Sequence, residues 1–366
     1  MKRLIEVFKS PKVFILSAFL IWESYLFLIE ILSPFILRRT YLGATPWFNF
    51  DGVHYLEIVK FGYFNYVQAF FPLFPILIKG WATILSNNYL IATFIIVYFF
   101  AIVTVFTFWK LIKIDYPARI ASWSLIFLFF FPSSFFLVSA YTESLFLALI
   151  FLSFYSARKE KFLLAAVFGA LASATRIVGV LILPSILMEL YKSRKSKIRD
   201  YVIALSLIPS GAVFYMTYLW IKFGDPLLFV HVQPGFGAGR SGGDIILLPQ
   251  VIYRYIKIFI TVPWSNYDYW IALLEISMFI FASLLIYIAY KKGIRRSYIL
   301  FSILALILPT LTGTFSSIPR YALVAFVIFP TLALIQNRFL RYTILIVGLL
   351  IETIISAFFL RGYFVS

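Results

Sequence analysis

Cysteine is absent from this 366-residue chain, and only two histidines occur, His54 and His231. The lack of cysteine excludes disulfides, thiolate metal ligands and a cysteine nucleophile. Two imidazoles do not favour a dedicated zinc cage. The sequence also lacks a glycine-rich phosphate loop, an Asp-x-Asp pair and paired histidines, so nothing in it supports a soluble nucleotide donor bound through a metal. We predict no cofactor and leave metal dependence open.

Charged residues are scarce, at 13% of the chain, whereas 63% of the residues are hydrophobic and 20% are aromatic. The mean hydropathy is +0.97. A soluble domain could not bury so much apolar surface, but a bilayer accepts helices of about 20 apolar residues without further cover. The composition therefore predicts an all-α polytopic membrane protein that forms one integral membrane domain over residues 1–366.

Acidic residues are fewer than basic ones, 15 against 32, which gives a net charge of +17. The basic residues lie largely in short connectors between apolar runs, as expected where they set membrane orientation. No basic stripe with interleaved aromatics stands outside those runs, so we predict membrane lipids and not nucleic acid as partners. The basic segment Met1–Lys12 leads into the apolar run Val13–Leu37, which is too long for a signal-peptide core and is expected to remain as a signal anchor.

The basic clusters predict how the chain crosses the membrane. They are Lys2–Lys12, Lys110–Arg119, Arg158–Lys161, Lys192–Arg199, Lys291–Arg296, and Arg338 with Arg341. If all of them face the cytoplasm, the apolar runs between them pair into hairpins. This predicts about eleven crossings: 13–37, 89–109, 119–139, 143–157, 161–175, 177–191, 201–222, 266–290, 297–313, 321–336 and 342–360.

Two outer connectors are long. The first, 38–88, contains the apolar segment Ala69–Leu85, which prolines interrupt and which we interpret as a juxtamembrane or re-entrant helix. The second, 223–265, carries His231, Gln233 and Arg240 among several glycines. A connector of this length is either a mobile surface loop or a lid.

The first outer connector also carries Asp51, His54 and Glu57, an imidazole between two acids. His54 and Glu57 would lie on the same helix face, one turn apart. Asp51 precedes a predicted short helix at residues 53–59, so its carboxylate is a helix N-cap, a solvated loop charge, or a catalytic or ligand-binding group. The sequence leaves these three interpretations open.

Arg176 and Arg320 also fall on the predicted outer side, away from the cytoplasmic excess of positive charge. Each could extend from a membrane end into water. Two outward guanidinium groups also suit a fork-like grip on phosphate, and a phosphate on a polyprenyl lipid would sit at this level. Glu143 follows Tyr141-Thr142 at a hairpin turn, where an acid is either exposed to water or binds a sugar hydroxyl.

Six motifs follow one another across residues 50–321: Phe50-Asp-Gly-Val-His-Tyr-Leu, Phe70-Phe-Pro-Leu-Phe-Pro75, Tyr141-Thr-Glu-Ser-Leu-Phe146, Thr175-Arg176 with Gly179, Phe223-Gly-Asp-Pro-Leu-Leu-Phe229 and Ser317-Ile-Pro-Arg-Tyr321. Together they resemble the GPI mannosyltransferase II family and its prokaryotic relatives, in the GT-C superfamily of polytopic glycosyltransferases. The resemblance implies a GT-C-like fold. It also implies transfer of mannose, or a related hexose, from a polyprenyl- or dolichyl-phosphate donor to an outward-facing glycolipid or glycan, with inversion.

The resemblance implies a role for several residues. Asp51 matches the base of the family, His54 and Glu143 would contact acceptor or sugar, and Arg176 and Arg320 would hold the donor phosphate. The further substrate-binding candidates are Tyr141, Asp225 and Gln233, and the further phosphate-binding candidate is Arg240. The chain departs from the eukaryotic pattern at Phe50, where tryptophan is usual, and at Ile177-Val178, where a more polar pair is usual. The acceptor is therefore left open.

Two alternatives to a transferase remain. A transporter or lipid flippase would bury charges midway along its helices and show an internal repeat, whereas the polar groups here gather at the outer ends. A non-catalytic subunit of a transferase complex is the other. In a prokaryote, the protein would lie in the plasma membrane with its site on the outer face.

Overall fold

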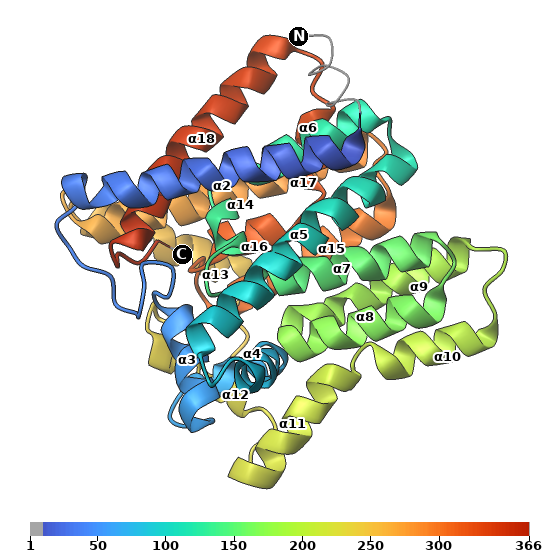
Figure 1. Ribbon diagram of the computed structural model, residues 1–366, viewed down its shortest axis with the longest axis horizontal. Coiled ribbons are helices and arrows are strands. Elements are labelled where there is room, and N and C mark those ends of the chain that lie inside the picture. Colours follow the sequence, from blue (N-terminus) through green and yellow to red (C-terminus); the bar gives the residue numbers. More distant parts are fainter. Residues whose placement is uncertain (1–9, 366) are drawn as a thin grey trace.

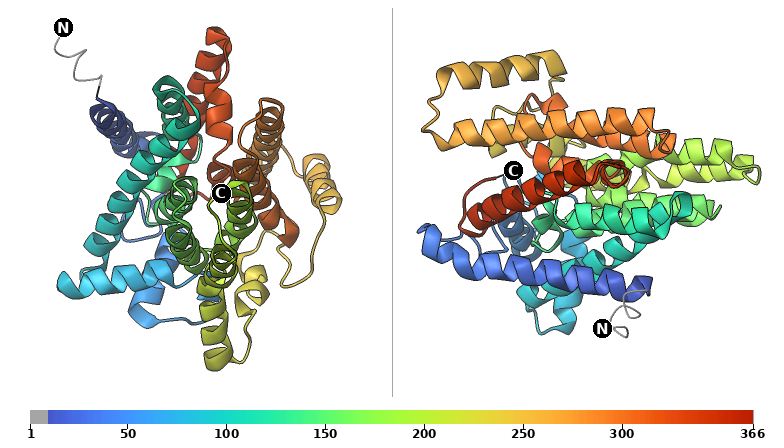
Figure 2. Two further views of the ribbon diagram at one scale, coloured as in Figure 1. Left: turned by 90° about the vertical axis from the view of Figure 1, so that its right-hand side faces the viewer. Right: turned by 90° about the horizontal axis from the view of Figure 1, so that it is seen from above.

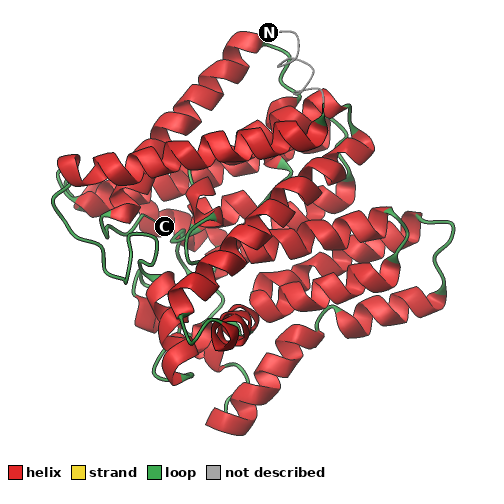
Figure 3. Ribbon diagram, in the orientation of Figure 1, coloured by secondary structure: helices red, strands yellow, loops and turns green. Residues whose placement is uncertain are grey.

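The computed structural model describes residues 10–365, in which every regular element is a helix (Figures 1 and 3). The main core of buried apolar side chains extends from Ile15 to Val365, and a smaller cluster joins Phe71, Ala212, Tyr215, Leu219 and Phe229. Five helices in this part of the chain are long and apolar enough to cross a membrane: Pro11–Ile36, Tyr89–Asp115, Ile198–Phe223, Tyr267–Lys291 and Arg338–Leu360. The predicted all-α multi-pass membrane fold is confirmed. The first basic cluster lies mostly outside the described residues.

The predicted crossings correspond in order to the observed helices, several of which are short or interrupted. The run 119–139 ends its α-helix at Phe129, and the run 321–336 is divided into two short helices. The helices are α2 (Pro11–Ile36), α3 (Asp51–Phe61), α4 (Leu73–Ile84), α5 (Tyr89–Asp115), α6 (Ala118–Phe129), α7 (Glu143–Arg158), α8 (Phe162–Thr175), α9 (Ile182–Lys192), α10 (Ile198–Leu207), α11 (Ser210–Phe223), α12 (Leu228–His231), α13 (Leu248–Thr261), α14 (Tyr267–Lys291), α15 (Arg296–Ile307), α16 (Ile318–Val324), α17 (Ile328–Ala333) and α18 (Arg338–Leu360).

Helix α4 lies across the bundle and not along it. It is seen end-on in Figure 1, where α7 and α8 are seen lengthwise, and the left panel of Figure 2 reverses this relation. Pro72 and Pro75 lie at its beginning, where a missing N–H group costs no helical hydrogen bond. The prolines therefore start this helix instead of breaking it, and its juxtamembrane position stays a prediction.

The connector 223–265 is not irregular throughout. It contains α12 and the longer α13, which begins with Pro249 in its first turn. Helix α13 runs beside α14, as the right panel of Figure 2 shows. Its core-facing side chains, Val251 and Tyr255, are one turn apart, as expected for an amphipathic helix.

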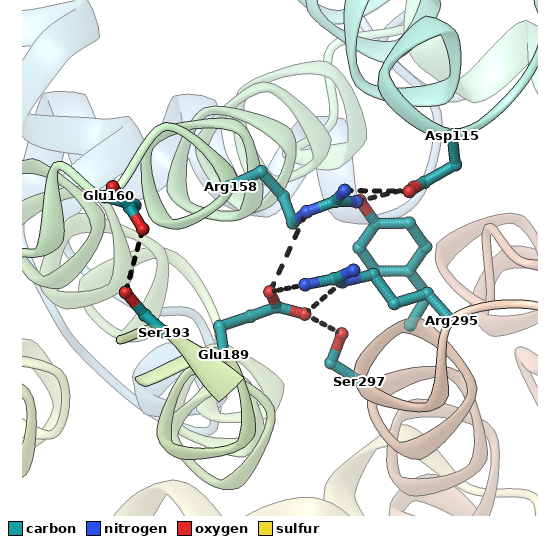
Figure 4. Close-up of polar contacts among 8 residues, drawn as sticks. Asp115, Arg158, Glu160, Glu189, Ser193, Arg295 and Ser297 are labelled. Atoms are coloured by element: carbon teal, nitrogen blue, oxygen red, sulfur yellow. Dashed lines mark hydrogen bonds and ion pairs between the residues drawn. The ribbon is translucent and has the colours of Figure 1, made fainter. Parts of the chain in front are cut away.

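Four of the basic connectors that we predicted to share one side of the membrane, 110–119, 158–161, 192–199 and 291–296, contribute residues to one end of the bundle (Figure 4). Arg158, at the end of α7, binds Asp115 of α5 through two hydrogen bonds of 2.5 and 2.8 Å. Arg295 donates to Glu189 of α9, with one N–O distance of 2.6 Å. We call this group the basic end. Because α7 runs from Glu143 to Arg158, the opposite end lies about 22 Å away.

We predict that Glu189 stabilises the basic end. Its carboxylate is 2% exposed and accepts from Arg295 and Ser297, so Glu189→Ala leaves a partly buried guanidinium without its partner. Breaking such a pair costs about 3–5 kcal/mol. Thermal unfolding of the detergent-solubilised protein should show a clear fall in Tm. The matched variant Glu160→Ala, at the exposed pair with Lys195, should leave Tm unchanged. Equal Tm values for the two variants would contradict this assignment.

Candidate active site

Four charged side chains from four elements meet at the end opposite the basic end. Asp51 begins α3, Glu143 begins α7, Arg176 follows α8, and Arg320 lies in α16. Arg320 Nη1 is 2.5 Å from Asp51 Oδ2 and 3.8 Å from Glu143 Oε1. Arg176 Nη1 is 2.6 Å from the same Glu143 oxygen. Positive and negative charges therefore alternate in the order Arg176, Glu143, Arg320, Asp51, which we call the ion-pair chain.

Both carboxylates of the ion-pair chain lie in the first turn of a helix, where the helix dipole favours negative charge. The N-cap position before α3 is Phe50, and its side chain makes no capping bond. Asp51 instead directs its carboxylate to Arg320, 269 positions away in the sequence. The N-cap interpretation of Asp51 is therefore wrong.

The backbone has an unusual conformation just before Asp51 and in the turn that precedes Arg320. Phe50 has φ of +50° and Ser317 has φ of +68°, although neither is glycine. Such conformations are costly for residues with a side chain and persist only where surrounding contacts enforce them. Gly179, near Arg176, allows close packing: a Cβ atom there would lie 2.3 Å from the backbone of Ala172. Only glycine lets the turn after Arg176 pack this closely on α8.

Burial decides the electrostatics of this group. Glu143 is fully buried, the Arg320 side chain is 9% exposed, and the Asp51 side chain is 24% exposed. Burial alone would raise the pKa of Asp51, but the charge and hydrogen bond of Arg320 outweigh it and hold the pKa below the ordinary 3.8. Glu143 Oε2 and Arg320 Nε have no hydrogen-bond partner among the described residues. Each can therefore take a further polar contact.

Aromatic rings hold the two arginines of the ion-pair chain in place. The Arg320 guanidinium lies 5.2 Å from the ring centroid of Tyr141, and that of Arg176 lies 4.8 Å from the ring of Tyr321. Tyr141 is buried, and its hydroxyl donates to the carbonyl of Asn49 at 3.1 Å. Tyr141, which we proposed as a substrate-binding residue, thus supports Arg320 through its ring.

Arg240 and Gln233, from the second long connector, join the site beside Arg320. Arg240 donates to Gln233 Oε1 at 3.3 Å and to the hydroxyls of Ser316 and Ser317 at 3.2 and 3.3 Å. No carboxylate of the described residues pairs with it within 4.0 Å. Burial lowers the pKa of Arg240, and the nearby charge of Arg320 lowers it further. A desolvated cation without an acidic partner favours an anionic ligand.

His54 lies one turn after Asp51 and is surrounded by aromatic rings. Its Nδ1 is 3.2 Å from Glu57 Oε2. The ring centroids of Tyr66 and Phe70 are both 5.4 Å away, and that of Phe236, from the second long connector, is 5.9 Å away. The two long connectors thus meet at His54, next to the ion-pair chain.

Asp225 is not brought into this group. Its carboxylate is 2.6 Å from His231 Nδ1 and accepts from the Leu227 N–H at 2.9 Å, which is the local bonding of a turn. It makes no hydrogen bond or ion pair with the ion-pair chain in the described structure. Asp225 therefore lies at an exposed turn beside His231.

Two supporting residues were missed by the sequence analysis. The Tyr255 hydroxyl donates to Glu275 of α14 and accepts from the backbone N–H of Phe315 at 3.0 Å. This contact holds the segment that leads to Ser317 and Arg320. Two sequence features could have identified them: Tyr255 lies on the apolar face of α13, and Glu275 is a lone acid in the apolar run of α14. Across residues 10–365, no three His, Cys, Asp or Glu side chains are grouped to hold a metal ion.

No family model matches this chain, and no curated protein matches it significantly in sequence. Among solved structures, it is similar to the Archaeoglobus fulgidus oligosaccharyltransferase in the apo form, at 13% identity and a TM-score of 0.47 over 94% of this chain and 56% of that one. The same enzyme tethered to an acceptor peptide with an NVT sequon gives 13% identity and a TM-score of 0.45, over 93% and 55% of the two chains. The chain spans little more than half the length of these proteins.

We predict that the Asp51–Arg320 pair makes stability depend on pH. A carboxylate whose pKa is lowered by folding stabilises the fold above its ordinary pKa of 3.8, and this contribution is lost as pH falls through the lowered value. Asp51→Asn should therefore lower Tm near neutral pH, and its difference from wild type should shrink below about pH 4. The exposed Asp268→Asn serves as the control. A difference that is the same at every pH would contradict the ion pair.

Proposed function

We propose that this protein is an integral membrane glycosyltransferase of GT-C type. It transfers mannose, or a related hexose, from a polyprenyl-phosphate donor to an outward-facing glycolipid or glycan, with inversion at the anomeric carbon. The observation that carries this proposal is one partly exposed acid, Asp51, paired with Arg320, which is linked to Arg176 through Glu143 and to Arg240 through the Ser317 hydroxyl. The ordered motifs, which resemble those of the GPI mannosyltransferase II family, support the same function.

The charges of the site suit such a donor. Arg176, Arg320 and Arg240 carry three positive charges, and Asp51 and Glu143 carry two negative ones, which leaves one positive charge. A sugar linked to a polyprenyl phosphate is a phosphodiester and carries one negative charge. Arg240, which has no acidic partner, is the residue best placed to bind it, and Ser316 and Ser317 supply neighbouring hydroxyls.

The reaction then needs a single displacement. Asp51 accepts the proton of an acceptor hydroxyl, and the hydroxyl oxygen forms a bond to the anomeric carbon. The bond between this carbon and the phosphate oxygen breaks, and its electron pair leaves with the polyprenyl phosphate. The arginines stabilise the charge that develops on that phosphate. Asp51 Oδ2 is bound to Arg320, so Oδ1 is the oxygen available to the acceptor.

Donor binding would also change the pKa of the proposed base, Asp51. In the free protein, Arg320 holds the pKa of Asp51 low, which makes its carboxylate a weak base. A bound phosphate adds a further negative charge near Arg320, beside those of Asp51 and Glu143, and raises the pKa of Asp51. The acid thus becomes more basic when the donor is present.

The transporter alternative gains one observation from the structure. Contrary to the expectation that charges lie only at outer ends, Glu352 and Glu275 are buried within α18 and α14. Glu352 accepts from Trp22 at 3.0 Å, and Glu275 accepts from Tyr255. Each acid is bonded to neutral side chains and neither extends a relay of ionisable groups, so both suit packing better than transport.

We predict that Asp51→Asn abolishes transfer. Loss of a general base costs about 10²–10⁴-fold in rate. The assay follows radiolabelled mannose from dolichyl-phosphate-mannose into a host lipid extract, with purified protein in detergent. Asp268→Asn, an exposed acid in the first turn of α14, should transfer as wild type does. Equal transfer by Asp51→Asn and wild type would remove Asp51 from the mechanism.

We predict that Arg240→Gln weakens donor binding. Hydrogen bonds to charged groups are worth about 1.5–3 kcal/mol, so Kd for a polyprenyl phosphate should rise about ten- to hundredfold. Arg38→Gln removes an exposed arginine just after α2, at the same end of the bundle, and should leave Kd unchanged. An unaltered Kd for Arg240→Gln would place the phosphate elsewhere.

A further inference from the structure

A pocket of about 380 Å³ lies between α3, α4 and α11. Ile58 and Val59 of α3 form its inner wall, and Ile76 of α4 and Phe214 of α11 form its rim. Almost all of its lining is apolar. Tyr63, Tyr215 and Tyr218 also line it. The hydroxyls of Tyr63 and Tyr215 donate to the backbone carbonyls of Phe70 and Gln68 at 2.9 and 2.7 Å.

This pocket opens toward lipid. Helix α11 is the outer part of the candidate span Ile198–Phe223, and Phe214 on it is 74% exposed. On the facing helix, Ile76 is 62% exposed. Large apolar side chains exposed on a membrane-spanning helix contact hydrocarbon, and a pocket between them takes a hydrocarbon chain in preference to a polar ligand.

Lys79 gives the pocket its one charge. It is the only charged residue in the lining, and no carboxylate of the described residues pairs with it. Lys79 is exposed in α4, the helix that lies across the bundle (Figures 1 and 2). A single ammonium beside an apolar pocket complements a lipid whose headgroup is anionic.

The pocket and the arginines lie at opposite ends of α3. Arg320 meets the helix at its N-terminus through Asp51, whereas the pocket uses the C-terminal half of the same helix. Ile58 is seven residues after Asp51, which is about 10 Å along the helix axis. A lipid seated here can extend its headgroup along α3 toward Asp51 without crossing the phosphate-binding arginines.

We propose that this pocket holds the hydrocarbon chain of the acceptor, with an anionic headgroup at Lys79 and the sugar directed to Asp51. The inference rests on the proposed glycosyl transfer and narrows its acceptor to an anionic glycolipid, as opposed to a soluble glycan. The donor chain lies elsewhere, because its phosphate is bound among the arginines.

The cysteine-free sequence allows a direct test that needs no transfer activity. Ile76→Cys places a single thiol at the pocket rim, and its maleimide labelling is measured in detergent with added lipid. Phosphatidylglycerol should slow labelling several-fold, more than phosphatidylcholine does. Adding Lys79→Gln should remove that difference. Ile84→Cys is the control, because Ile84 is exposed on α4 but outside the pocket, and its labelling should respond to neither lipid.

Any result other than these would contradict the proposal. Equal protection by both phospholipids would reject the anionic headgroup, and no protection would reject a lipid pocket. Protection only by a polyprenyl phosphate would assign the pocket to the donor. Since labelling is read without catalysis, a protein that binds phosphatidylglycerol here but shows no sugar transfer would contradict the proposed function and leave the lipid pocket standing.

Discussion

The candidate site depends on the ion pairs made by the Arg320 guanidinium. It binds Asp51 of the first long connector and approaches Glu143 at the start of α7. Removing such a group from water is costly, and only opposite charges with good geometry offset the cost. Because Glu143 is fully buried, it also needs Arg176. The ion-pair chain thus ties α3, α7, α8 and α16 together at one end of the bundle, and Arg240 lies beside it with no ion-pair partner among the described residues.

The two ends of the bundle use charge differently. At the basic end, Arg158 and Arg295 are each matched by a carboxylate, and their contacts join α5, α7, α9 and α15. At the other end, the ion-pair chain and Arg240 together hold three arginines and two acids, and Asp51 Oδ1 accepts no hydrogen bond from the described residues. Matched pairs hold helices together, whereas an unmatched cation beside a partly exposed acid is the arrangement expected of a site for an anion and a nucleophile.

Much of this organisation could be predicted from the sequence, because the bilayer imposes strong rules on composition. Long apolar runs predicted the helices, and Asp51, Glu143, Arg176 and Arg320 were identified since polar groups are rare outside the basic clusters. Their pairing could not be predicted, because Asp51 and Arg320 are separated by 269 positions and only tertiary packing brings them together. Interrupted runs such as 119–139 were also missed, since an apolar turn has the same composition as an apolar helix. Asp225 was selected by its motif, but its neighbours bind it locally.

The central claim is that the arginines bind a donor phosphate while Asp51 faces the transferred sugar. The most direct measurement is a cryo-electron microscopy structure of the protein in lipid nanodiscs with a polyprenyl phosphonate analogue of the donor, which cannot be cleaved. The account predicts its phosphonate oxygens within hydrogen-bond distance of Arg240, and the anomeric carbon on the side of Asp51. A phosphonate bound away from these arginines, or a sugar directed away from Asp51, would contradict it.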